Sequence, residues 1–413
     1  MRMRIALLTI SGLIVNLSVT AQPLRIASFD RSGNLLATNT SVQQRYSLGG
    51  SASVESLGPS NMTTLQSRVA HSASTAFRAT LEHPMMFFRV FLDPFATTDL
   101  AGDWTLHLLA SADDPADFAG WARFEINFNA LGTGTVTTVQ RSNGDTNISH
   151  PTISLTVGSD GTMSGLTPSP VMSLDKNTVF AVMNDGGGGF DMFTMVRRAA
   201  SGFATTDLRG QWTLFLLASP DDSSDLAGWA RFEMNFDAQG TGTVATVQRS
   251  NGDTNITNPT ISLTVGSDGT VSGLSPSPVM ALDKNAIYGV MNDGGGGYDF
   301  FVMVRRAASN FSTVDIAGQW TSLFLVTRYG PPAFAGWGRS ELTFDAQGSG
   351  IVTAVQRSNG DSSVTAPFSL AITPDGTVSG LTPSPVMALD KNTIYCVTTE
   401  QSGGFNFYFM VRR

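Results

Sequence analysis

A long internal repeat constrains the fold of this 413-residue chain more than any other feature. Three similar segments begin at Phe95 ("FATTDLAGDWTLHLLAS"), Phe203 ("FATTDLRGQWTLFLLAS") and Phe311 ("FSTVDIAGQWTSLFLVT"), so the period is 108 residues (203 − 95 and 311 − 203). Each copy closes with an apolar strand and two arginines: "DMFTMVRR", "DFFVMVRR" or "NFYFMVRR". Solenoid and propeller repeats are much shorter, roughly 20–50 residues. We therefore predict that each repeat is a domain, over residues 95–198, 203–306 and 311–413.

Turn signals at short intervals divide each repeat into strands. In the second copy, eight apolar runs are separated by "DAQG", "NGD", "SDG", "SPSP", "DKN" and "DGGGG", which carry the Gly, Asn and Asp that tight hairpins need. Short connections predict antiparallel neighbours in sequence order and no helix of note. Closure into a barrel removes the two exposed edges of such a meander. The predicted fold class is all-β, with three tandem eight-stranded up-and-down antiparallel barrels.

The residues before the repeats predict export and a further β-domain. Residues 1–21 combine Arg2 and Arg4 with an apolar run and small residues before Gln22, the pattern of a secretory signal peptide. Residues 22–94 read as short strands between polar turns, and "FFRV" at 87–90 resembles the last-strand signature of small β-sandwich modules in secreted bacterial proteins. A small β-sandwich is therefore expected here. The linkers between repeats, such as "AASGF" at 199–203, are short and predict a semi-rigid row of domains.

Composition limits the partners of the chain. The net charge is −8 and the basic residues are scattered, so nucleic acid and anionic membranes are not expected partners. No segment after the signal peptide is long and apolar enough to predict a membrane span. The single cysteine, Cys396, lies in an apolar strand-like run and is expected to be a buried hydrophobic residue. We predict a secreted or cell-surface protein.

A resemblance follows from the start and end of each repeat. "DLAGDW" at 99–104, "DLRGQW" at 207–212 and "DIAGQW" at 315–320 resemble the G-x-W that opens the first strand of lipocalin-like (calycin-type) barrels. In that family an arginine near the last strand covers the tryptophan. The resemblance implies that Arg198, Arg306 and Arg413, or the arginine before each, take this role. It also raises the alternative that each barrel binds a small apolar ligand.

The sequence contains no recognisable catalytic constellation. His107 and His150 are replaced in the second repeat by Phe215 and Asn258, so neither is a shared ligand. No cofactor and no enzymatic activity are predicted; an enzyme is the least favoured alternative, because no nucleophile with a base is found. The pair Arg-x-Glu in the second strand of each repeat is expected to form a surface ion pair outside the barrel, or else a buried ligand anchor.

The motif "QRSNGD" occurs in all three repeats. Asn-Gly is a strong hairpin-turn signal and explains part of the motif by structure alone. The alternative is that the loop presents its arginine to a partner, which makes Arg141, Arg249 and Arg357 the candidate partner-facing residues.

The run "NDGGGGFD" at 184–191, repeated as "NDGGGGYD" at 292–299, fits the letters of a calcium-binding nonapeptide. Such nonapeptides bind calcium as stacked tandem copies, whereas here the copies are a whole repeat apart. The third repeat has "EQSGGFNF" instead and lacks both aspartates. We predict a hairpin turn. The alternative is a weak calcium site at Asp185, Asp191, Asp293 and Asp299.

Together these features predict a secreted, non-enzymatic repeat protein with a structural or adhesive role. Repeated domains present the same surface several times, so weak contacts with a protein or glycan surface add through multivalency. The alternatives are an apolar ligand inside each barrel and, least favoured, an enzyme.

Overall fold

The structure is a computed structural model of the whole chain. It describes the backbone of six strands between residues 25 and 92 and then residues 94–111, 119–186, 188–220, 227–293, 297–306, 310–327, 335–364, 367–400 and 403–413. The predicted signal peptide lies outside the described residues. The chain divides into two compact units, Met1–Phe95 and Ala96–Arg413.

The first unit contains two three-stranded antiparallel sheets, ordered β1-β2-β5 and β4-β3-β6. The strands are β1 (Arg25–Phe29), β2 (Asn34–Thr38), β3 (Arg45–Ser51), β4 (Thr63–Val69), β5 (Ser74–Arg78) and β6 (Phe87–Leu92). The sequence "FFRV" lies in β6. The unit is thus all-β, and the β-sandwich over residues 22–94 stays a prediction.

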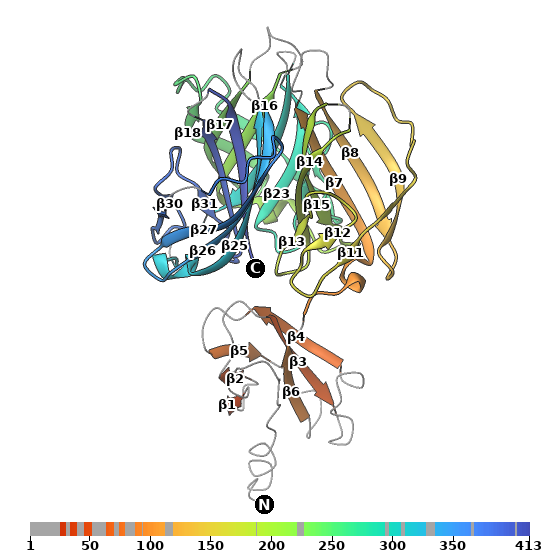
Figure 1. Cartoon of the computed structure of the whole chain (residues 1–413), viewed down its shortest axis with the longest axis vertical. Helices are drawn as coiled ribbons and strands as arrows, with labels where there is room; N and C mark the ends of the chain where they lie inside the picture. Colours follow the sequence, from red (N-terminus) through yellow and green to blue (C-terminus); the bar gives the residue numbers. More distant parts are fainter. Residues whose placement is uncertain are drawn as a thin grey trace, which may run out of the picture. The chain divides into compact units, whose positions relative to one another are not determined.

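The second unit contains the three repeats, which Figure 1 draws in orange to yellow, green to cyan and blue. The first repeat comprises β7 (Gly102–Ser111), β8 (Gly120–Phe128), β9 (Thr133–Arg141), β10 (Thr152–Ser154), β11 (Thr156–Val157), β12 (Met163–Ser164), β13 (Val171–Met172), β14 (Thr178–Asn184) and β15 (Phe190–Arg197). The second comprises β16 (Gly210–Ser219), β17 (Gly228–Phe236), β18 (Thr241–Arg249), β19 (Thr260–Ser262), β20 (Thr264–Val265), β21 (Val271–Ser272), β22 (Val279–Met280), β23 (Ala286–Asn292) and β24 (Tyr298–Arg305). The third comprises β25 (Gly318–Thr327), β26 (Gly336–Phe344), β27 (Ser349–Arg357), β28 (Phe368–Ser369), β29 (Ala371–Ile372), β30 (Val378–Ser379), β31 (Val386–Met387), β32 (Thr393–Thr399) and β33 (Phe405–Arg412).

Each repeat forms a closed antiparallel barrel. In the first repeat, seven strands are ordered β10-β9-β8-β7-β15-β14-β13, and β11 pairs with β12. The backbone N–H of Met163 donates to Pro170 and that of Met172 donates to Gly161, each at 2.9 Å, so β12 also bonds to β13. Since β10 and β11 are two halves of one strand interrupted at Leu155, the barrel has the predicted eight strands. The corresponding bonds close the other two barrels.

A single turn of 3-10 helix precedes the first strand of each barrel: η3 (Thr97–Leu100), η4 (Thr205–Leu208) and η5 (Thr313–Ile316). In η4 the Asp207 carboxylate accepts a hydrogen bond from the Ala204 N–H at 2.9 Å, which satisfies a donor at the start of the turn. Leu208, which ends the turn, is fully buried. The turn thereby fixes where the chain enters the barrel.

Apolar side chains fill the interior of each barrel. In the second repeat the inner cluster includes Trp212, Phe236, Met280, Phe301 and Met303, all nearly or completely buried. The strands alternate, so one face of each supplies this cluster. Gly242 on β18 is required for the packing, because a Cβ at this position would overlap the ring of Phe236.

A second apolar core lies outside the barrels and is common to all three repeats. It contains Phe180 and Val182 of β14, Phe300 and Val302 of β24, and Phe409 of β33, together with many equivalents. The predicted semi-rigid row is therefore wrong. The outer faces of the first and last strands of each barrel are apolar as well. Packing the three barrels against each other buries these faces, whereas a row of separate domains would leave them exposed to water.

The contacts between repeats are cyclic. The indole N–H of Trp121 in the first repeat donates to Asn292 Oδ1 in the second, at 2.5 Å. Trp229 in the second repeat donates to Thr399 Oγ1 in the third, at 2.8 Å, and Trp337 in the third donates to Asn184 Oδ1 in the first, at 2.6 Å. The three repeats thus close into a pseudo-threefold ring with three equivalent seams.

Candidate functional site

A tryptophan and an arginine are stacked in the base of every barrel. Trp212 is fully buried, and its indole N–H donates to the Leu208 carbonyl at 2.6 Å. The Arg305 guanidinium carbon lies 4.4 Å from the centre of the Trp212 ring, and Arg305 also donates to the carbonyls of Arg209, at 2.7 Å, and Asp207. The same stack joins Arg197 to Trp104 and Arg412 to Trp320. Each repeat ends in two adjacent arginines, and the first of the two covers the tryptophan.

The second arginine of each pair crosses a seam instead. Arg198 contacts Asp268 and Thr270 of the second repeat. Arg306 donates to Asp375 Oδ2 of the third repeat at 2.5 Å, and Arg413 donates to Asp160 Oδ2 of the first at 2.9 Å. Burial raises the pKa of the Asp375 carboxyl, but hydrogen bonds from Thr373 and Thr377 and the charge of Arg306 outweigh it and hold that pKa at about 2. The seam carboxylates are thus ionised partners.

The Arg-x-Glu pairs also lie at the seams. Arg123 and Glu125 are 2.5 Å apart, and the Arg123 Nε–H donates to the carbonyl of Ser277 in the second repeat at 3.1 Å. The pair therefore points out of its barrel, as expected. The expectation that it lies on the surface is wrong, because only 10% of the Arg123 side chain is exposed: the next repeat covers it.

The glycine runs form hairpins between the last two strands of their barrels. Asn184 is paired with Phe190, and the Asp185 Oδ1 accepts a hydrogen bond from the Gly189 N–H at 2.9 Å. Gly186 has φ = +83°, a conformation that glycine adopts readily. The Asp293 Oδ1 accepts the same bond from the Gly297 N–H at 3.0 Å, so both aspartates participate in the turns, as the hairpin interpretation requires. Among the described residues, no group of three or more His, Cys, Asp or Glu is placed to hold a metal ion.

The other two calcium candidates are buried at the barrel ends. Asp191 is 5% exposed and Asp299 is 3% exposed. Burial, and then the nearby charge of Asp185, raises the pKa of Asp191 to about 7; burial and Asp293 raise the pKa of Asp299 to about 8. A protonated carboxyl group is a poor calcium ligand, because metal ligands must be deprotonated.

Each of the three candidate partner-facing arginines forms an ion pair within its own loop. Arg141 donates to Asp145 Oδ2 at 3.0 Å and to the Asn147 carbonyl at 2.9 Å. Arg249 and Arg357 form the same ion pair with Asp253 and Asp361. About a quarter of each arginine side chain is exposed: 21%, 26% and 25%. Each "QRSNGD" loop is thus held by its arginine–aspartate pair, and part of the arginine side chain remains exposed to solvent.

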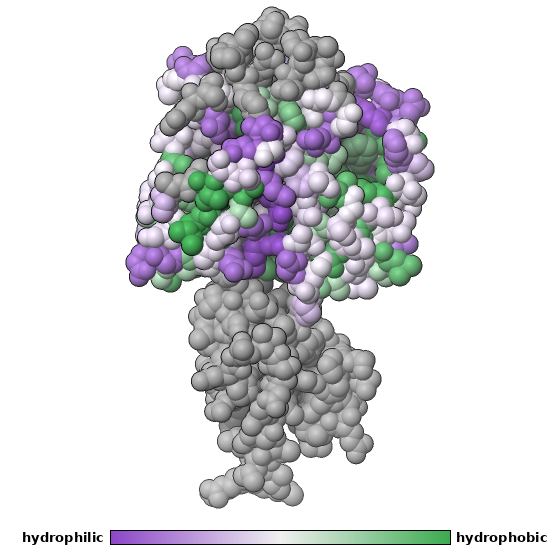
Figure 2. All heavy atoms as spheres, viewed as in Figure 1, coloured by the Kyte–Doolittle hydropathy of each residue, from purple (hydrophilic) through white to green (hydrophobic). Residues whose placement is uncertain are grey.

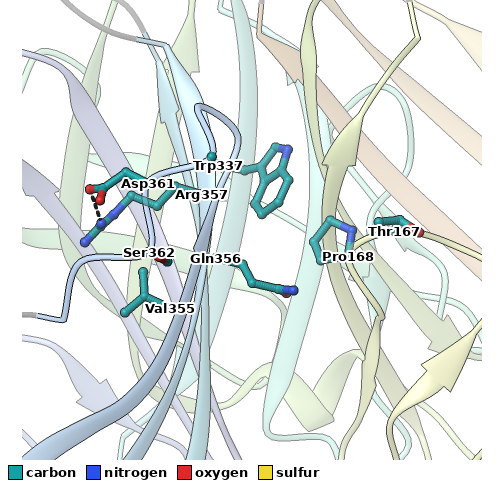
Figure 3. A pocket seen from close by; sticks show the side chains of 9 residues that line it. Thr167, Pro168, Trp337, Val355, Gln356, Arg357, Asp361 and Ser362 are labelled. Atoms are coloured by element: carbon teal, nitrogen blue, oxygen red, sulfur yellow. Dashed lines mark hydrogen bonds and ion pairs between the residues drawn. The ribbon is translucent and has the colours of Figure 1, made fainter.

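An open groove lies where this loop of the third repeat meets the first repeat (Figure 3). Its volume is about 210 Å³. It is lined by Thr167 and Pro168 of the first repeat and by Trp337, Val355, Gln356, Arg357, Gly360, Asp361 and Ser362 of the third. In Figure 3 the Gln356 side chain lies below Trp337 and Pro168, whereas Arg357 points toward Asp361. The groove was not predicted, because its two sides come from opposite ends of the repeat array.

Two other groups singled out in the sequence are buried. His107 occupies the outer-face position that Phe215 fills in the second repeat; its burial and then the charge of Arg123 lower its pKa to about 3. Cys396 is buried as expected, and burial raises the pKa of its thiol. Both groups are neutral at physiological pH.

The exposed surface is mixed in character. Figure 2 shows small apolar patches among polar atoms on one face of the repeats. Exposed large apolar residues include Leu131, Val314 and Ile351, which come from different turns and strands. Single exposed apolar residues are normal on a protein surface. No helix among the described residues is long and apolar enough to cross a membrane.

Comparisons with known proteins give no close relative. No protein-family model matches the chain, and no curated protein matches it. Among solved structures, the chain is similar to the isotype 1 transferrin binding protein B of serogroup B Neisseria meningitidis, at 10% identity and a TM-score of 0.23, over 94% of this chain and 85% of that one. It is also similar to a DUF3598-family protein of unknown function from Nostoc punctiforme, at 10% identity and a TM-score of 0.18, over 77% of this chain and 97% of that one. These scores are too low for any property to be carried over.

Proposed function

We propose that this is an exported, non-enzymatic binding protein that attaches to an extended surface through three equivalent contacts. The observation that carries the proposal is the cyclic closure of the repeats. Because each seam is built from the same positions, the ring presents the same loop and the same seam three times. Three weak contacts on one rigid body raise the apparent affinity well beyond that of one contact.

The "QRSNGD" loops are the contact elements in this proposal. Each is held by its own arginine–aspartate pair, so a partner does not have to order it on binding. The exposed quarter of Arg141, Arg249 and Arg357 adds hydrogen-bond donors at the same place on every repeat. A protein or a glycan surface is the expected partner.

Ligand binding inside the barrels is less well supported. The inner positions hold Trp212, Phe236, Met280 and Phe301, whose side chains pack against each other. An eight-stranded barrel is just wide enough for its own side chains to fill it. We also propose that the barrels are lipocalin-like, on the basis of the tryptophan–arginine stack, and that residues 1–21 direct export.

Binding to surfaces of increasing ligand density tests the proposal. The full chain without residues 1–21 is passed over immobilised polysaccharides and extracellular proteins at several densities. We expect dissociation to slow by at least tenfold as the density rises, because more of the three contacts engage together. Dissociation that is independent of density, or no binding to any surface, would contradict the proposal.

A further inference from the structure

The groove between the third and first repeats is lined by two largely buried apolar side chains, Trp337 (9% exposed) and Pro168, and by the exposed amide of Gln356. Trp337 of the third repeat and Pro168 of the first both line it, and the Gln356 side chain lies below them in the view of Figure 3. Gln356 is exposed, and its side-chain amide has no hydrogen-bond partner among the described residues. An amide offers two N–H donors and one oxygen acceptor. A ligand here meets apolar surfaces and an unused donor and acceptor together.

The charges at the groove are already paired. Arg357 Nη1 and Asp361 Oδ2 are 2.5 Å apart, and Arg357 also donates to the Ser363 carbonyl at 3.3 Å. The Asp361 Oδ1 accepts a hydrogen bond from the Ser363 N–H at 2.9 Å. Because the guanidinium and the carboxylate neutralise each other, the groove favours neither an anion nor a cation. Its remaining polar groups are neutral: the Gln356 amide and the hydroxyls of Thr167 and Ser362.

The size of the groove limits the ligand further. About 210 Å³ corresponds to roughly seven water molecules, which accommodates one small ring but not an acyl chain.

The same residue types recur at the other two seams. The equivalent positions are Trp121, Gln140, Arg141 and Asp145 opposite Ser275–Pro276 at the first seam, and Trp229, Gln248, Arg249 and Asp253 opposite Thr382–Pro383 at the second. Arg123 contacts Ser277 at the first seam and Trp229 contacts Thr399 at the second, so these elements do meet there. The residue types are thus repeated around the ring, with one difference: the Gln248 Oε1 at the second seam accepts a hydrogen bond from Arg231 Nη1 at 3.5 Å.

We propose that the three seams are subsites for neutral carbohydrate, each taking one sugar ring of a polysaccharide. This inference rests on the proposed multivalent function and names its ligand class. A neutral pyranose has an apolar C–H face, which suits the Trp337 and Pro168 walls, and hydroxyls that both donate and accept hydrogen bonds, which suit Gln356. Each subsite is weak alone, and a polymer that reaches several subsites binds more tightly.

The test compares glutamine variants on defined polymers. The probes are soluble glucan, mannan and galactan, with heparin as an anionic polymer and gelatin as a protein. The variant is Gln140→Ala with Gln248→Ala and Gln356→Ala. The matched control is Gln239→Ala with Gln347→Ala, two exposed glutamines in the "DAQG" turns. Equal melting temperatures for variant, control and parent establish that folding is intact.

We expect the parent protein to bind at least one neutral polymer. The triple variant should bind that polymer at least tenfold more weakly, and Gln356→Ala alone should reduce the binding less. The control should bind like the parent. Glycan binding that is unchanged in the triple variant would overturn the carbohydrate subsites, as would density-dependent binding to heparin or gelatin only. In the latter case the multivalent function survives, whereas the absence of density-dependent binding to every probe overturns both.

Discussion

At the residue scale, Asp299 shows how burial changes the protonation of a carboxyl group. It lies on β24 opposite Ala218, and its Oδ1 has no hydrogen-bond partner among the described residues. Burial and the charge of Asp293 raise its pKa to about 8. The third repeat has Asn406 at this position, which is neutral at every pH. An uncharged polar side chain therefore occupies this position in one of the three repeats.

This arrangement predicts a pH-dependent effect of Asp299→Asn. A carboxyl whose pKa is raised in the folded state contributes stability at low pH, and that stability is lost as the pH rises from the unfolded pKa, about 3.9, to the folded one. The advantage of the variant over the parent should therefore grow by up to about 1.4 kcal/mol per pH unit between pH 5 and 8.

Urea denaturation at pH 5, 6.5 and 8 measures this difference. Asp145→Asn is a suitable control, because Asp145 lies in an exposed loop. A constant difference between Asp299→Asn and parent across these pH values would contradict the buried carboxyl. Calcium chloride should leave the parent curve unchanged if the glycine runs are turns only.

At the element scale, the hairpin turns differ in how strictly they require glycine. Gly240 and Gly252 have nearly the same φ, +84° and +80°. A Cβ on Gly240 would overlap the Leu263 carbonyl oxygen, whereas a Cβ on Gly252 meets nothing within 4 Å. Both positions favour glycine by conformation, but only Gly240 also lies against another strand segment.

Gly240→Ala is therefore expected to destabilise the protein more than Gly252→Ala. A left-handed conformation costs a non-glycine residue about 1–2 kcal/mol, which both variants share. The overlap with the Leu263 carbonyl should add at least about 2 kcal/mol in Gly240→Ala, because the backbone on either side must shift. Midpoints of urea denaturation compare the two, and equal losses would show that the turn relaxes freely.

The strands and turns could largely be predicted from the sequence, because their signals are local. Alternation along β8 and β17 identified one apolar face, and Asn-Gly located the turn after β9 and β18. The stack of Arg305 on Trp212 was anticipated only from a family resemblance. The seam groove could not be predicted, since Pro168 and Trp337 are far apart in the sequence and nothing local indicates that they meet.

At the scale of the whole molecule, the shared core couples the three repeats. Phe180 lies 4.8 Å from Phe409 between ring centres, and the hydroxyls of Tyr288 and Tyr395 are 2.5 Å apart. These residues come from all three repeats and are almost completely buried. Separating one repeat from the others exposes this core, so no repeat is expected to unfold alone.

Scanning calorimetry of the full chain tests this coupling. Residues 96–413 should unfold in one transition whose calorimetric and van't Hoff enthalpies agree. Phe409→Ala should lower the stability of this transition by about 3–5 kcal/mol without splitting it. Leu131→Ala, at a residue that is 81% exposed, serves as the control. Three separable transitions would indicate independent barrels.

The sequence by itself determined the repeat and the order of its strands, because hydrophobic alternation and turn residues act over a few positions. Only the tertiary structure decided that the barrels form a ring. Strands such as β14 and β15 are apolar on both faces, which indicates burial on both sides but does not identify the covering surface. That surface belongs to another repeat. Because the three repeats pack around a common core, Arg413 at one end of the array lies against Asp160 near the other.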